Sequence, residues 1–372
     1  MTSIFRGNIL TTAGFIDGKI EAGDDGRIVR IDGVAIDADA VRQSRSPIIV
    51  PGFIDLHVHG GGGRDVMEGG DAIATITRVH ALHGTTSMLA TTMTAPPEDL
   101  QRALEGLRGH AHGPGHARVL GVHLEGPYIA AGKLGAQPGF TRPASLDEVR
   151  ALDAIAPVRL VTLAPELPGH LDAIRELTAA GFTVQVDHTA GTYEDGVAAL
   201  QHGARSFTHL FNAMTPLHHR LPGMVGAALA HADHAEVIPD LLHVHAGAIR
   251  AALRAIPHLY CVTDSTAATG MPDGDYRLGR QAVTKCLGGV RLANGTLAGS
   301  ALTMDRALRN LVGPVGLELD DACRRLSTHA ADLLGLQDRG RIAVGAFADL
   351  VLLDAALQVT QVVVEGVAAG RS

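Results

Sequence analysis

Residues 51–63 read PGFIDLHVHGGGG, and the rest of the chain is organised around this stretch. Within it, Asp55, His57 and His59 alternate with apolar residues. Side chains two positions apart on a β-strand point to the same face. We therefore expect the two imidazoles to project together from the end of a strand, above a glycine-rich loop. Two neutral imidazoles side by side suit a borderline divalent metal ion such as zinc, although short His-x-His patterns also occur among ordinary surface or core histidines.

Beyond this stretch, short apolar segments alternate with amphipathic helical patterns. The expected strands are residues 53–58, 85–92, 118–124, 159–164, 183–188, 206–211, 236–244 and 259–264. Helical patterns lie between most of these strands, at residues 72–82, 98–107, 146–155, 171–180 and 193–201. Strands that alternate with helices predict a parallel sheet, and eight of them predict a closed (β/α)8 TIM barrel in the α/β class.

The two ends of the chain differ from this middle part. Residues 1–50 hold short strand-like pieces separated by Asp-Gly turns, without a helical pattern, and short strands return at residue 340. We expect residues 1–50 and 340–372 to pair into one small β-sandwich domain beside a barrel of residues 51–339. The other segments before the C-terminal strands are a turn-rich insertion and two helices, expected at residues 270–297, 301–311 and 320–334.

The composition is that of an ordinary globular protein, 46% hydrophobic and 19% charged over 372 residues, with a formal net charge of −8. This acidic balance argues against nucleic-acid binding, and no apolar run is long enough for a membrane span. The N-terminal residues lack the pattern of a signal peptide, so we expect a cytoplasmic protein. The three cysteines are far apart in sequence and predict reduced thiols, so a metal site must be built from the 20 histidines and the carboxylates.

Histidines and carboxylates stand at the ends of several expected strands. In (β/α)8 barrels the site is built at the C-terminal ends of the strands. Five of the expected strands end in such residues: His57, His59, Glu125, His188, His209 and Asp264. Several imidazoles and a carboxylate at one mouth predict a divalent metal site with room for a bound water. The alternative for each histidine is a hydrogen-bonded polar residue at the barrel rim.

Asp264 is the expected general acid and base. A metal lowers the pKa of a bound water, and a further group must take a proton from that water and return it to the leaving group. Asp264 stands at the end of the eighth strand, where it meets this need. The alternative is a local hydrogen-bond acceptor, since Thr263, Ser265 and Thr266 surround it.

The remaining histidines are expected to play no part in a metal site. His123 shares a face with Glu125 but lies one step deeper, so we expect it in the core or behind a ligand. The others lie on helical faces or in loops, where we expect them to be solvated or locally hydrogen-bonded: His80, His83, His110, His112, His116, His170, His202, His231, His234, His258 and His329.

A second cluster predicts recognition of an anion. Its members are Asn212, Ala213, His218, His219 and Arg220 after the sixth strand, with His243 and His245 at the expected end of the seventh. Arginine and histidine beside exposed backbone amides suit a phosphate group. The alternative is a solvated basic loop.

Taken in order, these motifs resemble those of the N-acetylglucosamine-6-phosphate deacetylases, a family within the amidohydrolase superfamily. The resemblance runs almost from end to end of the chain. Several of the motifs are long and specific: PGFIDLHVHGGGG, GTTSMLATT, GVHLEGPYI, VTLAPE, DHTAGTYEDG, THLFNAMTPLHHRLPGMVGAAL, VTDSTAATG and GTLAGSALTM.

The resemblance implies a metal held by Glu125, His188 and His209. Family members that keep the His-x-His motif can hold two ions, and this chain keeps His57 and His59. We therefore expect one or two divalent ions per subunit, with zinc as the expected metal and Glu125 able to bridge a pair. The carboxylated lysine that bridges the metals in many superfamily members is ruled out, because none of the three lysines ends the fourth strand.

The resemblance also implies that Asp264 is the general acid and base. The substrate-binding positions that it implies are Ala136, Gln137, Asn212, Ala213, Arg220, Asp240, Leu241, Leu242, His243, Leu297, Ala298 and Gly299. Gln137 stands where the family often has histidine. Some phosphate contacts in the family come from the neighbouring subunit, which implies a homodimer.

The predicted function is metal-dependent hydrolysis of N-acetyl-D-glucosamine 6-phosphate to D-glucosamine 6-phosphate and acetate, in amino-sugar catabolism or cell-wall recycling. Three alternatives stay open: the same chemistry on N-acetylgalactosamine 6-phosphate, a cyclic-amide hydrolase resembling dihydroorotase, and a catalytically inactive amidohydrolase-fold scaffold. The missing bridging lysine and the segment HLFNAM argue against the cyclic-amide hydrolase. The complete set of expected ligands argues against the scaffold.

Overall fold

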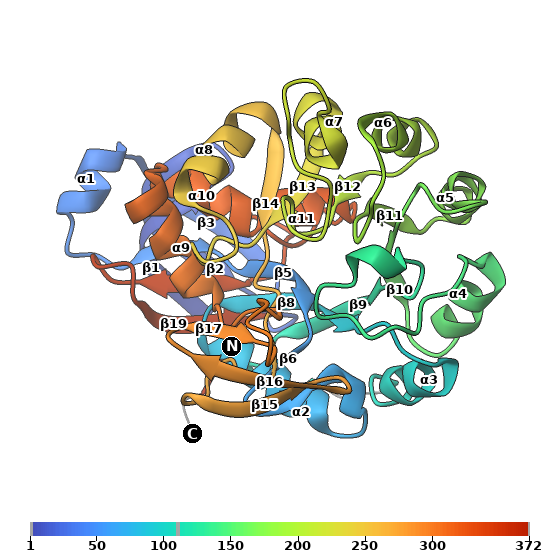
Figure 1. Ribbon diagram of the computed structural model, residues 1–372. Coiled ribbons are helices and arrows are strands. Elements are labelled where there is room, and N and C mark those ends of the chain that lie inside the picture. The colour runs from blue at the N-terminus through green and yellow to red at the C-terminus, as the bar shows by residue number, and fades with distance from the viewer. Residues whose placement is uncertain (1–2, 109–111, 371–372) are drawn as a thin grey trace.

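Eight parallel strands build the barrel in the computed structural model, which describes residues 3–108 and 112–370. Six of them form one curled sheet in the order β12-β11-β10-β9-β8-β5, and the other two, β13 and β14, pair with each other (Figure 1). Their bounds are β5 Phe53–Val58, β8 Thr85–Thr92, β9 Arg118–Glu125, β10 Val158–Leu163, β11 Thr183–Val186, β12 Ser206–Phe207, β13 His234–Val237 and β14 His258–Cys261. The predicted α/β barrel is therefore confirmed.

Backbone hydrogen bonds join these two sheets at both seams. The N–H of Asp264 donates to the carbonyl of His57 at 2.9 Å, so the segment after β14 runs along β5. The N–H of Leu210 donates to the carbonyl of Glu236 at 2.8 Å, which joins the segment after β12 to β13. The sheet is thus closed at the level where the expected site residues lie.

Helices surround the strands on the outside of the barrel (Figure 1). They are α2 Ala72–Leu82, α3 Pro97–Glu105, α4 Leu146–Asp153, α5 His170–Ala179, α6 Tyr193–Gln201, α7 Gly223–His231, α8 Ala246–Ala255, α9 Met304–Asn310, α10 Leu319–Leu326 and α11 Thr328–Leu333. Local sequence explains where they begin: Thr192 and Asp195 form a reciprocal capping box on α6, and Ser145 caps α4. No helix within the described ranges is long and apolar enough to cross a membrane.

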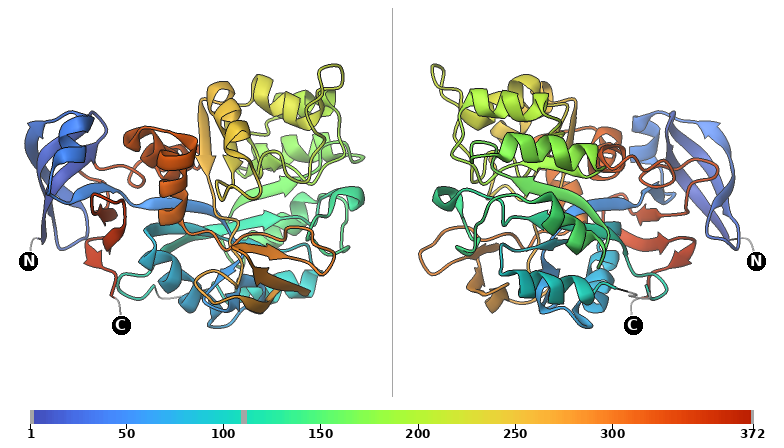
Figure 2. Two further views of the ribbon diagram at one scale, coloured as in Figure 1. Left: turned by 60° about the vertical axis from the view of Figure 1, so that its left-hand side comes forward. Right: turned by 90° about the vertical axis from the view of Figure 1, so that its right-hand side faces the viewer.

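The two chain ends meet in one small β domain (Figure 2). Its seven strands form a single sheet in the order β20-β19-β18-β4-β1-β2-β3. Their bounds are β1 Ser3–Thr11, β2 Gly14–Ala22, β3 Ile28–Ala35, β4 Ile48–Pro51, β18 Leu350–Leu353, β19 Val359–Val364 and β20 Val367–Ala368. The sheet curls over its own apolar cluster, so the N–H of Ile28 at one edge donates to Ala346 O, just before β18.

Several local expectations were wrong. Residues 1–50 were expected to lack helices, yet α1, Ala38–Gln43, is capped by the side chain of Asp37. The turn-rich insertion expected at residues 270–297 is present, but it also holds an antiparallel sheet that was not expected, made of β15 Gly274–Leu278, β16 Gln281–Cys286 and β17 Gly289–Arg291. The helix expected over residues 301–311 is shorter and continues into a π-helical segment, η3, Leu311–Val315. The helix expected over residues 320–334 is two helices, because Ser327 has a non-helical backbone conformation and interrupts it.

Candidate metal centre

The expected ligands lie at or just beyond the C-terminal ends of the strands. His57 and Glu125 belong to β5 and β9, whereas His188, His209 and Asp264 lie two or three residues past the ends of β11, β12 and β14. These three have positive φ angles of 47°, 26° and 49°. Non-glycine residues in this region carry strain that the surrounding structure must hold, and such strain gathers at functional sites. The turn of the backbone at each strand end brings these side chains over the barrel mouth.

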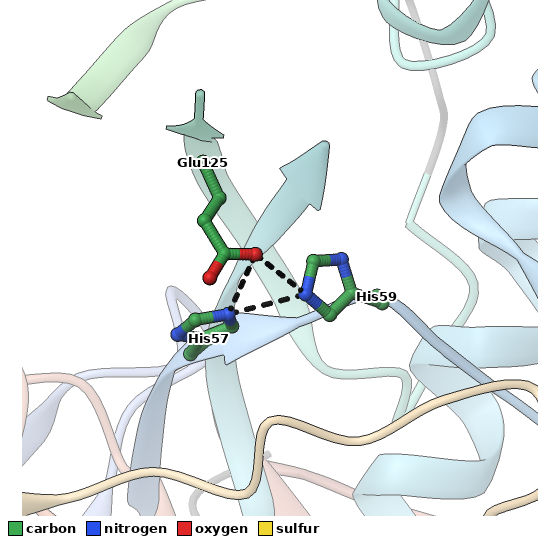
Figure 3. A group of neighbouring side chains, drawn as sticks. All are labelled: His57, His59 and Glu125. Atoms are coloured by element: carbon green, nitrogen blue, oxygen red, sulfur yellow. Dashed lines mark hydrogen bonds and ion pairs between the residues drawn. The ribbon is translucent and has the colours of Figure 1, made fainter. Parts of the chain in front are cut away.

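One side of the cluster is made by His57, His59 and Glu125 (Figure 3). The two Nε2 atoms lie 3.2 Å apart, so the imidazoles do project together as the His-x-His pattern predicts. Oε2 of Glu125 lies 3.0 Å from Nε2 of His59 and 3.4 Å from Nε2 of His57. All three residues are buried.

The other oxygen of Glu125 faces a second histidine pair. Its Oε1 lies 3.1 Å from Nε2 of His188 and 3.1 Å from Nε2 of His209. These two Nε2 atoms are 3.3 Å apart. One carboxylate thus faces two pairs of imidazoles, and each oxygen with its pair makes a three-ligand group that could hold a metal ion.

The far nitrogens of three of these rings lie beside acceptor oxygens, in hydrogen bonds for His57 and His188 and in an ion-pair contact for His209. Nδ1 of His57 lies 2.8 Å from Oε1 of Glu236, and Nδ1 of His209 lies 2.5 Å from a carboxylate oxygen of Asp187. Nδ1 of His188 donates to the backbone carbonyl of Lys133 at 2.7 Å. An acceptor at Nδ1 keeps the proton there and leaves the lone pair on Nε2, which is the arrangement found around metal-binding histidines. The donor set therefore fits a divalent cation.

The electrostatics of the cluster also favour a cation. Burial alone lowers the pKa of His57, but the carboxylates of Glu125, Asp264 and Glu236 raise it well above its usual value. The pKa of His209 is raised in the same way against the effect of burial. Buried carboxylates thus surround the imidazoles and demand positive charge from either protons or a metal ion.

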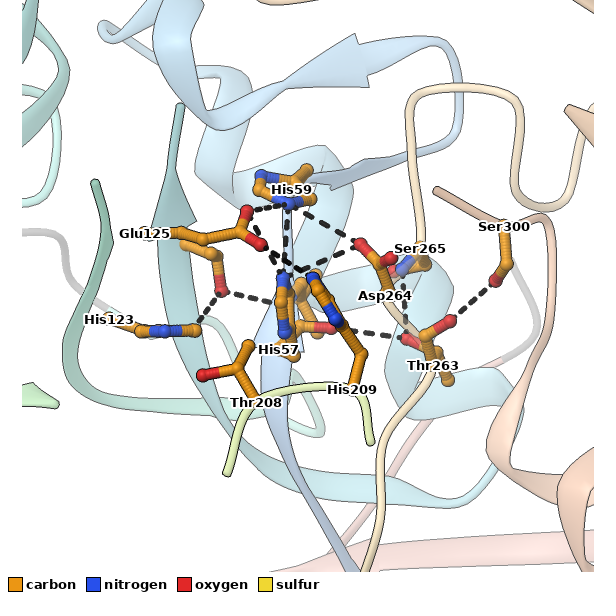
Figure 4. Close-up of polar contacts among 12 residues, drawn as sticks. His57, His59, His123, Glu125, Thr208, His209, Thr263, Asp264, Ser265 and Ser300 are labelled. Carbon is orange, nitrogen blue, oxygen red and sulfur yellow. Dashed lines mark hydrogen bonds and ion pairs between the residues drawn. The ribbon is translucent and has the colours of Figure 1, made fainter. Parts of the chain in front are cut away.

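Asp264 faces the first histidine pair from the neighbouring segment after β14, which runs along β5 (Figure 4). Its Oδ1 lies 3.4 Å from Nε2 of both His57 and His59. Burial raises the pKa of Asp264, but the two histidines outweigh burial and hold it below its usual value. The carboxylate is therefore ionised and ready to accept a proton.

Gln137 is held against Glu125 rather than left free in its loop. The N–H of Thr94 donates to Oε1 of Gln137 at 2.7 Å, which identifies the amide oxygen. The amide nitrogen must then face Glu125, and it donates to Oε2 of that carboxylate at 2.6 Å. Gln137 is 5% exposed, so the amide fixes the position of the central carboxylate in a buried setting.

A cavity of about 240 Å³ opens above the cluster and Asp264. Its lining includes Ala136, Gln137, Asn212, Ala213, His243, Leu297 and Gly299 from the expected substrate-binding set. Apolar side chains that the sequence analysis did not single out complete the walls, namely Met93, Ile238 and Leu278. Such a mixture of apolar walls and a few polar groups is typical of a small-molecule site.

The rest of the expected substrate-binding set lies outside this lining: Arg220, Asp240, Leu241, Leu242 and Ala298. Ala298 is fully buried in the core. Asp240 accepts a hydrogen bond from Nδ1 of His243 at 2.7 Å and so orients a ring that does line the cavity. Arg220 is exposed, and its guanidinium donates to His219 at 2.7 Å.

The seventh strand differs from the expectation. The structure places β13 at His234–Val237, so the bounds expected for this strand, residues 236–244, were wrong. His243 and His245 therefore lie in the loop beyond it, where the side chain of His245 caps α8. The shift leaves Glu236 inside the barrel rather than at the start of a strand.

Sequence analysis predicted no role for several buried polar residues around the ligands. Glu236 accepts from both Nδ1 of His57 and the N–H of His209, at 2.8 and 2.9 Å. Asp55, two residues before His57, accepts from the hydroxyl of Thr263 at 2.6 Å and joins β5 to the segment after β14. The alternation of Asp55 with His57 and His59 indicated that the Asp55 side chain points into the barrel. Nothing in the sequence around Glu236 indicated the same for its side chain.

Most of the other histidines are locally hydrogen-bonded, as expected. Nε2 of His80 donates to Gly60 O at 3.0 Å, and Nδ1 of His170 donates to Ala164 O at 2.8 Å. His123 is buried with its ring edge-on to that of His57, at a centroid distance of 4.7 Å. His110 lies outside the described residues.

Comparison with known proteins identifies the family. The model of the Amidohydrolase family matches residues 48–369. The chain belongs to the amidohydrolase family. Among curated relatives of this amidohydrolase, N-acetylglucosamine-6-phosphate deacetylase of Lysinibacillus sphaericus is 37% identical over 353 residues, covering 92% of this chain and 91% of the relative. N-acetylgalactosamine-6-phosphate deacetylase of Escherichia coli O157:H7 is 38% identical over 376 residues, covering 98% and 99%.

Solved structures agree with this placement of the amidohydrolase. A mutant N-acetyl-D-glucosamine-6-phosphate deacetylase from Mycobacterium smegmatis, in complex with N-acetyl-D-glucosamine-6-phosphate, superposes with a TM-score of 0.89 at 35% identity over 99% of both chains. N-acetylglucosamine-6-phosphate deacetylase from Thermotoga maritima superposes with a TM-score of 0.88 at 31% identity over 100% of both chains. The similarity thus includes the barrel and the terminal β domain together.

Proposed function

We propose that this amidohydrolase is a metal-dependent deacetylase that converts N-acetyl-D-glucosamine 6-phosphate and water to D-glucosamine 6-phosphate and acetate. The observation that carries the proposal is the convergence of Glu125, two histidine pairs and Asp264 at one barrel mouth, where all of them except His57 line one cavity. The names and high coverage of the relatives support the choice of an amino-sugar phosphate as substrate. Amino-sugar catabolism is the metabolic setting that follows.

The ligands we propose for the metal are Glu125, His188 and His209, with His57 and His59 as a second group that shares Glu125. Imidazole nitrogens with a carboxylate oxygen suit zinc, and a shared carboxylate suits a pair of ions. A divalent ion bound there supplies Lewis acidity, which polarises a substrate carbonyl and lowers the pKa of a bound water.

Asp264 is the proposed general base and acid. It is ionised and reaches over the first histidine pair, so it accepts the proton of the water that attacks the acetamide carbon. It then returns this proton to the amide nitrogen, because an amine leaves readily only when protonated. Gln137 acts through Glu125, as a positioning residue that holds the carboxylate between the histidine pairs.

The phosphate pocket is proposed at the outer part of the cavity, where Asn212, Ala213 and His243 line the wall. Arg220 does not line the cavity of its own chain, yet its guanidinium is exposed and able to reach another molecule. We propose a homodimer in which Arg220 of the partner subunit completes the phosphate contacts. The three cysteines are free, in keeping with the reducing cytoplasm that we propose as the location.

The proposed function is tested by acetate release from purified, zinc-loaded protein. N-acetylglucosamine 6-phosphate is the test substrate, and unphosphorylated N-acetylglucosamine is the control. Fast release from the phosphorylated sugar alone is the expected result. Equal release from both sugars would retain the deacetylase but remove the phosphate pocket. No release from any N-acetylhexosamine 6-phosphate by protein with bound metal would refute the function and favour an inactive scaffold.

N-acetylgalactosamine 6-phosphate is a second candidate substrate. It is favoured by the 38% identity to the Escherichia coli O157:H7 relative over nearly the whole of both chains. The two sugars differ only in configuration at C4. Measuring kcat/KM for both under the same conditions identifies the preferred epimer.

A further inference from the structure

A separate cluster of metal-binding side chains lies at the opposite end of the barrel strands. His234 and His258 are the first residues of β13 and β14 and are paired in register across the two strands. Asp233 immediately precedes β13. The cluster is thus at the N-terminal ends of the strands, whereas Glu125 and Asp264 lie at the C-terminal ends. In barrels of this kind, catalysis takes place at the C-terminal face, so this cluster has another role.

The carboxylate of Asp233 faces both histidines. Its Oδ1 lies 2.9 Å from Nδ1 of His258, and its Oδ2 lies 3.0 Å from Nδ1 of His234. The two rings are stacked, with centroids 4.9 Å apart and an interplanar angle of 26°. One ligand atom from each of the three residues lies within 4.8 Å of the others, which is close enough to surround one cation.

The two rings are held in place by different means. His234 is 7% exposed, and within the described ranges its Nε2 has no hydrogen-bond partner that competes for the ring. His258 is packed edge-on by the ring of His329, at a centroid distance of 5.2 Å. Nδ1 of His329 is itself fixed by Leu259 O at 3.1 Å. The ligands are therefore largely preorganised by the fold, which reduces the cost of ordering them around an ion.

The outer side of the cluster is open to solvent. The side chains of Asp233 and His258 are 64% and 44% exposed. An ion held by these residues would keep further coordination positions for water, and the exposed carboxylate has room to adjust to metal–ligand distances. Two imidazoles with one carboxylate suit zinc, nickel or copper rather than calcium or magnesium, which prefer oxygen ligands.

We propose that Asp233, His234 and His258 form a peripheral site for a borderline divalent cation such as zinc. A cation bound there would connect the N-terminal ends of β13 and β14, which pair as a two-stranded sheet of their own. A ligand that binds the folded chain and not the unfolded chain stabilises the fold by mass action. The cation therefore strengthens the part of the barrel that is least continuous with the six-stranded sheet.

The test is zinc stoichiometry by equilibrium dialysis followed by metal analysis. The variants His258→Gln and Asp233→Asn each remove one ligand. His231→Gln is the matched control, because His231 is an exposed histidine at the end of α7 whose ring contacts Tyr193 and not the cluster. Wild type and the control are expected to bind one more zinc per chain than the two ligand variants, or to bind that zinc at least tenfold more tightly, since loss of outer partners alone weakens metal sites about 10- to 100-fold.

Two further readouts separate this site from the catalytic centre and from misfolding. Acetate release is expected to be the same in wild type and all three variants, because none of the residues lines the cavity. The rise in the thermal unfolding midpoint on adding zinc should be smaller in His258→Gln than in the control. Equal zinc stoichiometry and affinity in all four proteins, or a wild-type chain that binds no zinc beyond the ions of the catalytic cavity, would overturn the proposal.

Discussion

The substitution Gln137→Leu removes the amide that holds the central carboxylate of the metal centre. In the structure, Nε2 of Gln137 donates to Oε2 of Glu125 at 2.6 Å, and both side chains are buried. Leucine has a similar volume and no polar atom, so the cavity wall is kept and the hydrogen bond is lost. The companion variant Gln137→Glu keeps an acceptor for the N–H of Thr94 but turns a carboxylate oxygen toward Glu125.

The expected magnitude follows from the charge of the acceptor. A hydrogen bond to a charged group contributes about 1.5–3 kcal/mol, which corresponds to a factor of roughly 10 to 150 at about 1.4 kcal/mol per tenfold. Loss of an outer partner of a metal ligand typically costs about 10- to 100-fold in metal affinity or activity. We therefore expect Gln137→Leu to lower zinc affinity or kcat by about one to two orders of magnitude.

The assay combines competition for zinc by a chelator with steady-state acetate release. If Gln137 acts on Glu125, zinc affinity and kcat fall while KM changes little. If Gln137 instead contacts the sugar, KM rises and zinc affinity is unchanged. Wild-type zinc affinity together with wild-type kcat in both Gln137→Leu and Gln137→Glu would refute the positioning role.

Other predictions follow from the same geometry. Asp264→Asn should lower kcat by roughly 10²- to 10⁴-fold or more with unchanged metal content, and normal turnover would rule out its role in proton transfer. Arg220→Ala should raise KM for the phosphorylated sugar far more than it lowers kcat; an unchanged KM means that the anion binds elsewhere. Thr263→Val deprives the buried carboxylate of Asp55 of a donor at 2.6 Å, and it should lower the free energy of unfolding in denaturant by about 1–3 kcal/mol. An unaltered unfolding midpoint would contradict this. Removal of metal with a chelator should abolish acetate release and added zinc should restore it, whereas activity that survives in demonstrably metal-free protein would exclude a metal-dependent reaction.

The sequence was most informative where periodicity and residue chemistry agreed. The bounds of β5 were predicted correctly because its apolar run and the alternation of His57 and His59 both follow the two-residue period of a strand. Strand β13 was misplaced for the opposite reason. The apolar pairs Val237-Ile238 and Leu241-Leu242 suit a strand, but Pro239 and Asp240 stand between them, and in the structure residues 238–242 belong to the loop that carries His243 to the cavity.

The site was predicted less completely than the fold, because position along the chain does not reveal backbone turns. The backbone at His188, His209 and Asp264 turns toward the cluster with positive φ angles, which the residue types at these positions do not predict. The contact of Gln137 with Glu125 depends on a loop whose path is set by tertiary packing. The sequence could therefore predict which histidines and carboxylates come together at the barrel mouth, but not which other residues hold them in place.

The terminal sheet has a consequence for the synthesis of the protein. Strand β4 lies between β1 and β18, and the chain passes from Pro51 almost directly into β5, which carries His57. On the ribosome, β1 is available early, but β18 emerges only after the whole barrel has been made. Until then, one edge of Ile48–Pro51 stays unpaired and apolar, which is a condition that favours association with other chains. Strand β4, which leads into the first strand of the metal centre, is thus paired on both edges only after the barrel has been made.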